Sequence, residues 1–286
     1  MAIIETKHIS FGYSHGTPFA ITALDDVSFS IDKGETVAVI GHTGSGKSTL
    51  MQMLNGLLKP ESGVVLFDGK DINADRQFSR QVRFKVGLCF QYPEYQLFEE
   101  TCFRDISFGP KNMGLDESEI KKRVINAARI VGLPEPLLDR SPFDLSGGQK
   151  RRCAIAGVIA MQPEVLILDE PTAGLDPRGR DEVFNMIRSY RESTGAAIMI
   201  VTHSMEDAAK LADRILVMNK GKLVLDGSAD VIFKQSEKLL EMGLNVPAST
   251  RLVDRLRKIG CDLDPNVYTA EAAANEIARY FRRNNT

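Results

Sequence analysis

Residues 36–48 read Thr36-Val37-Ala38-Val39-Ile40-Gly41-His42-Thr43-Gly44-Ser45-Gly46-Lys47-Ser48. The first five form a continuous apolar run, typical of a strand buried on both faces of a parallel sheet. The last eight match G-x-x-x-x-G-K-[ST], and the final two of them begin a helix that we expect over residues 47 to about 58. Backbone N–H groups of such a loop surround phosphates at the helix N-terminus. The stretch predicts an α/β fold in which Lys47 holds phosphates and Ser48 binds Mg²⁺, rather than a chance glycine-rich turn.

A second apolar strand, over residues 165–168, ends in Asp169-Glu170-Pro171. In open α/β sheets, ligands bind at the carboxyl ends of the strands, which is where these two carboxylates would lie. Asp169 fits the carboxylate that binds Mg²⁺, and Glu170 fits the base that orients and deprotonates an attacking water. The pair could instead cap the next element, but its occurrence beside a phosphate loop favours the catalytic interpretation.

A third element, Leu145-Ser146-Gly147-Gly148-Gln149, precedes a helix expected over residues 149–161. Ser146 is a natural N-cap, and adjacent glycines expose several N–H groups, so this helix start is a second candidate anion site. Standing alone, the segment would be interpreted as a flexible turn. The basic run Lys150-Arg151-Arg152 that follows is interpreted as a solvated helix face rather than an anion patch.

The remaining patterns predict a parallel core, an antiparallel layer and a helical insertion. Strand patterns over 9–13, 27–32 and 64–67 predict an antiparallel layer, and in 27–32 apolar residues alternate with polar ones. Strands over 165–168 and 197–201 flank a helix over 180–191, which predicts a βαβ unit. A hairpin is expected over 215–225, and helical patterns over 231–242, 250–259 and 270–283. We expect a domain over 1–229, with a helical subdomain at about 93–162, and a helical C-terminal domain over 230–286.

Composition excludes several classes of protein. The chain has 286 residues, 43% apolar and 26% charged, with a net charge of −2, so neither disorder nor a basic nucleic-acid platform is expected. Its longest apolar run, Cys153 to Met161, is too short to span a bilayer, and no secretory signal is present. The four cysteines form no C-x-x-C pair and are expected to be small buried residues in a reducing cytoplasm.

Residues 1–230 resemble the nucleotide-binding subunit of ABC transporters, because the loop 41–48, the signature 145–149, the carboxylate strand 165–170 and Ala173-Gly174-Leu175-Asp176 occur in this order. The resemblance implies a P-loop NTPase of ABC type that hydrolyses ATP with Mg²⁺. It implies that Gln91, after a strand over 86–90, touches Mg²⁺ and the water, and that His203 is the switch histidine near the γ-phosphate. Tyr13 takes the position of an aromatic residue that stacks on adenine, although packing within the outer sheet is an alternative.

The candidate residues form three groups. The catalytic residues are Glu170, His203 and Gln91, and the Mg²⁺ ligands are Ser48, Gln91 and Asp169. The ATP-binding residues are Tyr13, Gly41, His42, Thr43, Gly44, Ser45, Gly46, Lys47, Ser48, Thr49, Ser146, Gly147, Gly148 and Gln149, of which His42 and Thr43 are expected to be spacers. The family pattern also implies head-to-tail dimers, in which the signature of one subunit closes on the ATP bound by the other.

The segment Phe90-Gln91-Tyr92-Pro93-Glu94-Tyr95-Gln96-Leu97-Phe98-Glu99-Glu100-Thr101 narrows the resemblance to the ATPase of energy-coupling factor (ECF) importers of vitamins and transition metals. That family has a short helix after the glutamine loop and a helical tail. The tail sequence Gly243-Leu244-Asn245-Val246-Pro247 is similar to the second of its two paralogous ATPases.

The ECF resemblance implies a peripheral subunit on the cytoplasmic face of the cell membrane. The subunit would pair with a paralogous ATPase through its C-terminal domain and dock, between Pro93 and Glu100, on a transmembrane coupling protein that engages substrate-binding membrane subunits. Glu94, Glu99 and Glu100 would face arginines of that protein, although a solvated acidic face is the alternative. A homodimeric ATPase of a dedicated cobalt or nickel importer is the competing function. A DNA-repair ABC ATPase is disfavoured, because residues 47–169 leave no room for long coils.

Overall fold

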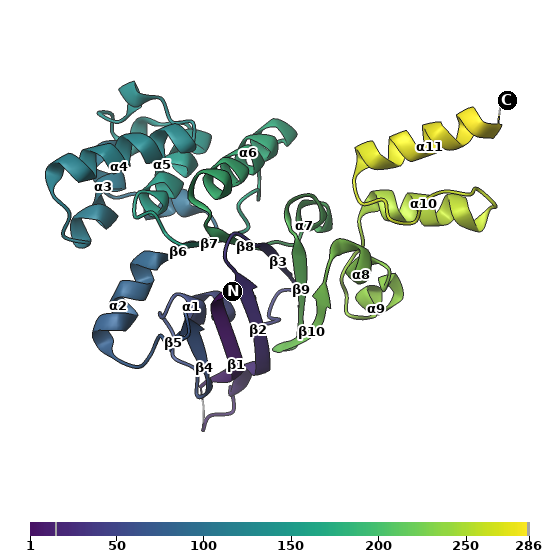
Figure 1. Cartoon of the computed structure of the whole chain (residues 1–286), viewed down its shortest axis with the longest axis horizontal. Helices are drawn as coiled ribbons and strands as arrows, with labels where there is room; N and C mark the ends of the chain where they lie inside the picture. Colours follow the sequence, from purple (N-terminus) through teal and green to yellow (C-terminus); the bar gives the residue numbers. More distant parts are fainter. Residues whose placement is uncertain (15, 285–286) are drawn as a thin grey trace.

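Two β-sheets of different type meet around the phosphate loop (Figure 1). The computed structural model describes residues 1–14 and 16–284. Its larger sheet has the order β10-β9-β3-β8-β7-β6. Parallel pairing joins β3 (Thr36–Ile40), β6 (Val86–Cys89), β7 (Val165–Asp169), β8 (Ala197–Val201) and β9 (Arg214–Asn219), and β10 (Lys222–Gly227) adds an antiparallel edge. The parallel core and the C-terminal hairpin predicted from the sequence are confirmed.

The smaller sheet is antiparallel, with the order β2-β1-β4-β5. Its strands are β1 (Ala2–Tyr13), β2 (Ile21–Asp32), β4 (Ser62–Phe67) and β5 (Lys70–Asp71). The first two are longer than expected, because β1 pairs with a neighbour on each side and accommodates several bulges. The antiparallel layer is therefore confirmed, and the predicted starts of its first two strands were too late.

Helix α1 (Lys47–Leu54) lies between the two sheets, in a hydrophobic cluster that takes residues from both. It buries Leu50, Met51 and Leu54 completely. The expectation that this helix continues to about Leu58 was wrong. The helix ends at Leu54 with Asn55 as its C-cap, because Gly56 has a φ of +72° and turns the chain away, which is a common helix termination.

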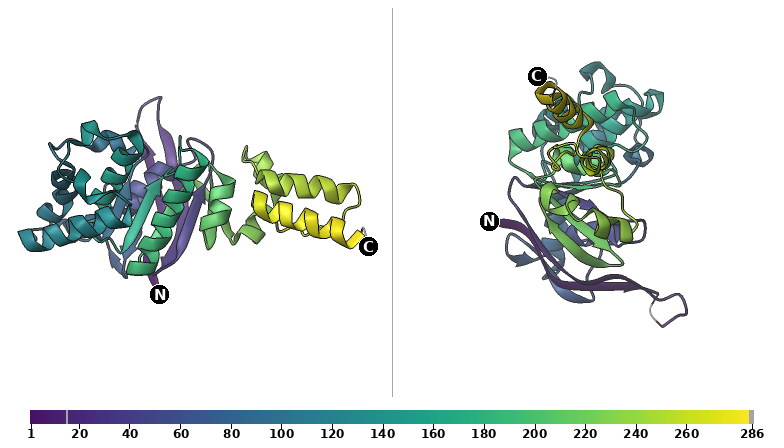
Figure 2. Two further views of the ribbon diagram at one scale, coloured as in Figure 1. Left: turned by 90° about the horizontal axis from the view of Figure 1, so that it is seen from above. Right: turned by 90° about the vertical axis from the view of Figure 1, so that its right-hand side faces the viewer.

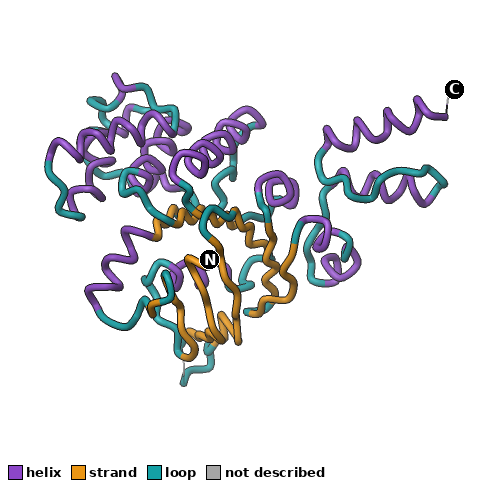
Figure 3. Tube along the Cα trace, in the orientation of Figure 1, coloured by secondary structure: helices purple, strands orange, loops and turns teal. Residues whose placement is uncertain are grey.

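The other face of the larger sheet carries a helical layer (Figures 1 and 3). Its helices are α3 (Cys102–Asn112), α4 (Glu117–Ile130), α5 (Gly147–Ile159) and α6 (Pro177–Thr194), with 3₁₀ turns η1 (Pro93–Gln96), η2 (Glu135–Leu137) and η3 (Pro142–Asp144). The expected helical insertion is present. Helix α5 begins two residues earlier than predicted and also ends two residues earlier. Helices α2 (Arg76–Lys85) and α7 (Met205–Leu211) were not predicted. Helix α2 is mostly polar and packs on the core mainly through Phe78 and Val82, of which only Val82 is buried.

The C-terminal segment divides into two parts. The single helix expected over 231–242 is two short helices, α8 (Ala229–Phe233) and α9 (Ser236–Glu241), separated by Gln235 in a non-helical conformation. They pack on β9, β10 and α7 in one hydrophobic cluster. Helices α10 (Ala248–Lys258) and α11 (Ala270–Asn284) project from the rest of the chain and share a separate cluster centred on Val253 (Figure 2). The domain boundary at residue 230 stays a prediction, and residues 285–286 of that domain lie outside the described residues.

The four cysteines are free thiols: Cys89, Cys102 and Cys153 are buried as expected, and Cys261 is partly exposed. Within residues 1–14 and 16–284, no helix has the length and apolar composition needed to cross a membrane.

Candidate functional site

The phosphate loop follows β3 and needs glycine where other backbone segments approach it. A Cβ on Gly41 would lie 2.4 Å from the carbonyl oxygen of Met218, and a Cβ on Gly46 would lie 2.4 Å from that of Ala23. Gly46 also has a φ of +104°, which side chains with a Cβ rarely adopt. The sheets on both sides therefore hold the loop tightly, and a larger residue at either position would displace it.

Lys47 is buried at the start of α1 and bonds to its own loop. Its Nζ donates to the carbonyl oxygen of Gly41 at 2.7 Å and to that of His42 at 3.0 Å. Burial lowers the pKa of this ammonium, while the negative charges of Glu170 and Asp169 act in the opposite direction. The arrangement holds a partly desolvated cation beside two carboxylates, where an anionic ligand would stabilise it.

His42 ties the phosphate loop to the hairpin between β9 and β10. One ring nitrogen, Nδ1, lies 2.7 Å from the carbonyl oxygen of Thr43, and Nε2 lies 3.0 Å from Oδ1 of Asn219. Both ring nitrogens are thus engaged within the protein, as a spacer role would require.

The two carboxylates stand at the end of β7. Burial raises the pKa of Asp169, which the Lys47 charge partly offsets. Burial, and then the neighbouring charge of Asp169, raise the pKa of Glu170 to about 7. Glu170 also has a φ of +49°, a sparsely populated conformation for a residue with a Cβ. Such outliers persist only where the surroundings enforce them, so the fold holds this side chain in place.

His203 follows β8 and faces Glu170. Its Nε2 lies 3.2 Å from Oε1 of Glu170, but this oxygen is buried and has no hydrogen-bond partner. Burial lowers the pKa of the imidazole, and the positive charges of Lys47 and His42 lower it further. The site therefore contains a buried carboxyl oxygen without a hydrogen-bond partner, next to an imidazole whose lowered pKa favours its neutral form.

One cavity of about 410 Å³ brings most of the predicted residues together. It is lined by Tyr13, Ile21, Ala23, Thr43, Gly44, Gly46, Lys47, Ser48, Thr49, Gln91, Asp169, Glu170 and His203. Gly41, His42 and Ser45 belong to the same loop but do not line the cavity, and Ser45 is fully buried. Ile21 and Ala23 were not predicted, because they lie in the first half of β2, before the strand expected from residue 27.

Tyr13 packs within the outer sheet and also lines the cavity. Its ring lies edge-on to Phe11, with centroids 5.0 Å apart, as packing within the outer sheet requires. Its hydroxyl lies 3.2 Å from Oγ1 of Thr49, and about two-fifths of the residue stays exposed at the cavity. Its contact with adenine stays a prediction.

The signature residues lie at the exposed start of α5, away from this cavity. Ser146 and Gln149 form a capping box: the Gln149 N–H donates to the Ser146 hydroxyl at 3.4 Å, and the Ser146 N–H donates to the Gln149 side chain at 3.0 Å. A Cβ on Gly147 or Gly148 would meet nothing within 4 Å. This helix start is thus open, and none of its predicted ligand residues lines the cavity of the same chain.

Two predictions about charged side chains were wrong. Glu94 was expected to face a partner, but only 16% of its side chain is exposed and it forms an ion pair with Arg151 at 3.1 Å. Arg151 was expected on a solvated face, yet it is only 6% exposed. The physical reason is that η1 buries Pro93 and folds against α5, which encloses the pair. Glu100 is exposed, as expected, and pairs with Arg104.

A groove of about 380 Å³ opens between α2, which contributes Arg83 and Phe84, and η1, α3 and α5. The Phe98 and Phe108 rings stand edge to face in it, with centroids 5.1 Å apart, and both are about half exposed. At its floor, the Asp105 carboxylate accepts the N–H groups of Phe98 and Glu99 at 3.3 and 3.0 Å. Burial raises the pKa of Asp105. The groove thus combines an aromatic rim with a shielded carboxyl group.

Known proteins resemble this chain in both sequence and structure. Residues 24–173 match the family described as "ABC transporter". The chain is 53% identical over 279 residues to the energy-coupling factor transporter ATP-binding protein EcfA2 of Caldanaerobacter subterraneus subsp. tengcongensis, covering 98% of each chain. The protein of the same name from Clostridium tetani is 52% identical over 284 residues, which is 99% of each chain.

Two solved structures show the same fold. The structure of cbiO1 from Clostridium perfringens, described as part of the ABC transporter complex cbiONQ, has a TM-score of 0.74 and 42% identity, covering 84% of this chain and 94% of that one. The ATP-binding cassette MJ0796, a dimer in a post-hydrolysis state bound to ADP and Pi, has a TM-score of 0.71 and 28% identity, covering 79% and 98%. The predicted P-loop fold of ABC type is thereby confirmed.

The raised pKa of Glu170 predicts a pH-dependent stability. The folded protein binds this proton with a pKa of about 7, against an ordinary value of 4.5, so the contribution to stability is complete below about pH 4.5 and is lost as the pH rises to about 7. Glu170→Gln cannot ionise. The free energy of unfolding of Glu170→Gln minus that of the wild type should therefore increase by roughly 2 kcal/mol between about pH 5 and about pH 8. Both proteins are unfolded in urea, without nucleotide and with a chelator. Glu192→Gln, at an exposed position, is the control. The prediction would be contradicted if Glu170→Gln differed from the wild type in its free energy of unfolding by the same amount at both pH values.

Proposed function

We infer that this chain, which belongs to the ABC transporter family and within it to the energy-coupling factor transporter ATP-binding proteins, binds and hydrolyses ATP to power uptake across a membrane. One observation carries the inference: the phosphate loop, Asp169, Glu170, Gln91 and His203 line one cavity. We propose vitamins or other micronutrients as the cargo, taken up through a transmembrane coupling protein and substrate-binding membrane subunits.

ATP binding would replace contacts that the phosphate loop now makes with itself. Lys47 Nζ, bonded to two loop carbonyls, would turn to the β- and γ-phosphate oxygens. The N–H groups at the start of α1 would bind the phosphates together with the helix dipole. Tyr13 would stack on adenine at the other end of the cavity. A phosphate charge would also compensate the desolvated Lys47.

The residues present fit Mg²⁺. Ser48, Gln91 and Asp169 supply a hydroxyl, a carboxamide and a carboxylate in one cavity, and hard oxygen donors suit this ion. In the described part of the chain, no three His, Cys, Asp or Glu side chains form a metal cluster, but Mg²⁺ bound mainly by nucleotide phosphates and water needs none. When bound, the ion would neutralise charge on the transferring phosphoryl group.

Glu170 would be the base for hydrolysis. A pKa of about 7 is close to that of an efficient general base at neutral pH, and its Oε1 has no hydrogen-bond partner, so it can accept the proton of the attacking water. Gln91 would orient that water, and the His203 imidazole would interact with the γ-phosphate. Both side chains line the same cavity as Glu170.

A second ATPase subunit would complete the site. Ser146, Gly147, Gly148 and Gln149 do not line the cavity of their own chain, so they would reach ATP only across a dimer interface. The relative MJ0796 is described as a dimer. We propose a paralogous ATPase as the partner, since the relatives that match over nearly the whole chain are named energy-coupling factor transporter ATP-binding proteins. Self-association with full ATPase activity would instead favour the homodimeric cobalt or nickel importer.

The membrane partner would dock on the groove beside residues 93–100, at the cytoplasmic face of the cell membrane. An apolar helix segment carrying an arginine fits both the aromatic rim of Phe98 and Phe108 and the carboxyl group of Asp105. This groove replaces Glu94 as the proposed contact, because Glu94 is already paired.

Glu170→Gln should retain ATP binding and lose most turnover, because the amide keeps the shape of the side chain but cannot accept a proton. We expect at least about a hundredfold loss of phosphate release, with ATP affinity within about threefold of the wild type. Phosphate release and equilibrium ATP binding, both measured with Mg²⁺, check this. Near-normal turnover would exclude Glu170 as the base.

Phe98→Ser together with Phe108→Ser should reduce copurification of the membrane proteins by at least about fivefold, because the apolar rim of the groove is removed. ATP binding should not change. Phe19→Ser, at an exposed aromatic residue outside the groove, is the matched control. Full copurification of the double variant would argue against this docking site.

The proposed dimer contacts of the C-terminal helices lead to a separate prediction. Leu252 and Phe281 are exposed apolar residues on α10 and α11. Leu252→Glu combined with Phe281→Glu should weaken association of the two ATPases by at least about tenfold, measured by analytical ultracentrifugation, because burying the new charges is costly. Leu57→Glu, at a similarly exposed site near α1, should not have this effect. Unchanged association would refute the role of these helices.

A further inference from the structure

A single buried arginine connects three segments of the site. Arg151 lies on α5, two residues after Gln149 of the signature. Its Nε and Nη2 donate to the two oxygens of Glu94 at 3.2 and 3.1 Å, in the paired geometry that only a guanidinium provides. Its Nη1 donates to the carbonyl oxygens of Ala173 and Pro171 at 2.9 and 3.4 Å.

Each of these segments adjoins a group with a proposed role in hydrolysis. Glu94 belongs to η1, three residues after Gln91 and beside the groove proposed for the membrane partner. Pro171 follows Glu170 directly, and Ala173 lies three residues after it. The guanidinium also lies over the Tyr92 ring, 5.9 Å from its centroid, which adds a second contact with the glutamine loop.

A short chain of hydrogen bonds leads from Arg151 to the backbone of Glu170. The Ala173 carbonyl accepts from Arg151 at 2.9 Å, and the Ala173 N–H donates to the Glu170 carbonyl at 3.0 Å. Glu170 itself has a φ of +49°. Because such a conformation persists only where neighbouring contacts enforce it, the tight turn over residues 170–173 requires anchoring, and Arg151 supplies an anchor from α5.

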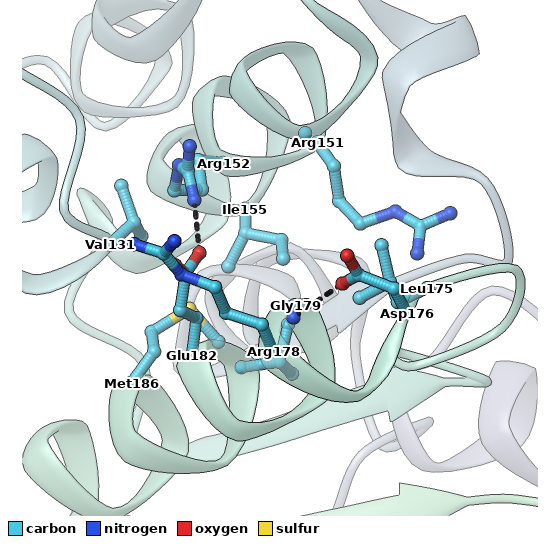
Figure 4. Close-up of a pocket in the computed structure, with 12 residues that line it drawn as sticks. Val131, Arg151, Arg152, Ile155, Leu175, Asp176, Arg178, Gly179, Glu182 and Met186 are labelled. Atoms are coloured by element: carbon cyan, nitrogen blue, oxygen red, sulfur yellow. Dashed lines mark hydrogen bonds and ion pairs between the residues drawn. The ribbon is translucent and has the colours of Figure 1, made fainter.

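The neighbouring arginine acts differently. Figure 4 shows Arg152 directed to Glu182, with which it forms an ion pair at 2.8 Å, whereas the Arg151 guanidinium points away from that pair. The ion pair with Glu182 connects α5 to α6. It involves neither Glu94 nor the turn after Glu170. Consecutive positions on α5 therefore have separate partners, and of the two arginines it is Arg151 that joins η1 to the turn after Glu170.

We propose that Arg151 is a positioning residue for ATP hydrolysis, which holds the turn 170–173, and through it Glu170, in a fixed relation to Glu94 of η1. A displacement of η1 would then move the base. This inference rests on the proposed role of Glu170, and it adds a link between the groove and the chemical step. Lysine could not perform the role fully, because a single ammonium cannot match the two-oxygen contact and the carbonyl bonds together.

The test is a double-mutant cycle in the complex purified with its native membrane partners. Arg151→Gln and Glu94→Gln should each lower kcat for ATP hydrolysis by at least about tenfold, while the KM for ATP stays within about threefold, since neither side chain lines the ATP cavity. The double variant should lose no more activity than Arg151→Gln alone, because both changes break the same link. Arg151→Lys should recover only part of the activity. Arg129→Gln, at an exposed arginine on α4, should behave as wild type.

The readouts separate positioning from simple stabilisation. A purely structural role would lower the melting temperature and the amount of folded complex, but would leave kcat per folded complex unchanged. The proposal would be overturned by an unchanged kcat per folded complex or by a proportional loss of ATP binding. It would also be overturned if the two single-variant losses multiplied in the double variant. If Arg151→Gln does not fold, Glu94→Gln and Arg151→Lys decide the question by the same kcat and KM criteria.

Glu170→Gln is measured in parallel. Normal hydrolysis by that variant would refute the proposed base. An inactive Glu170→Gln beside a fully active Arg151→Gln would refute only the role of Arg151.

Discussion

The chemistry of this protein depends on parallel strand pairing, which brings four distant segments to one edge of a sheet. Val39 pairs with Val201, Asp169 also pairs with Val201, and Cys89 pairs with Leu168. The residues that follow these strands are therefore neighbours in space although they are far apart in sequence. They carry the phosphate loop, Gln91, Glu170 and His203. Without this pairing, each motif would be an isolated turn.

The same edge concentrates charge in a partly desolvated space. Burial lowers the pKa of Lys47 and raises those of Asp169 and Glu170, so each group is shifted toward its neutral form. The attraction between the lysine and the carboxylates offsets only part of this cost. An ATP–Mg²⁺ complex, which carries both phosphate anions and a divalent cation, would complement both sets of charges. A ligand of this kind would fit the charged edge better than a neutral ligand would.

The helical layer adds a mechanical connection to this charged edge. Its α5 begins at the exposed signature and, one turn later, extends Arg151 to Glu94 and to the backbone after Glu170. A buried charge with a complete set of partners resists displacement, because separation would leave an uncompensated ion. The segments that would contact ATP and the segment beside the groove proposed for the membrane partner thus share one connection through Arg151.

Local sequence patterns are sufficient to predict the phosphate loop, the carboxylate pair, the Ser146 cap and the parallel core strands. These features are local: a glycine pattern, an apolar run or a capping residue acts on the few residues around it. By contrast, the buried pair of Glu94 and Arg151, which are 57 residues apart, and the packing of α8 and α9 on the sheet follow from the way the whole chain folds. The tertiary structure also places Ile21 and Ala23 at the cavity. Charged and short amphipathic segments have the same local pattern whether they face water or another segment, so their partners depend on how the whole chain packs.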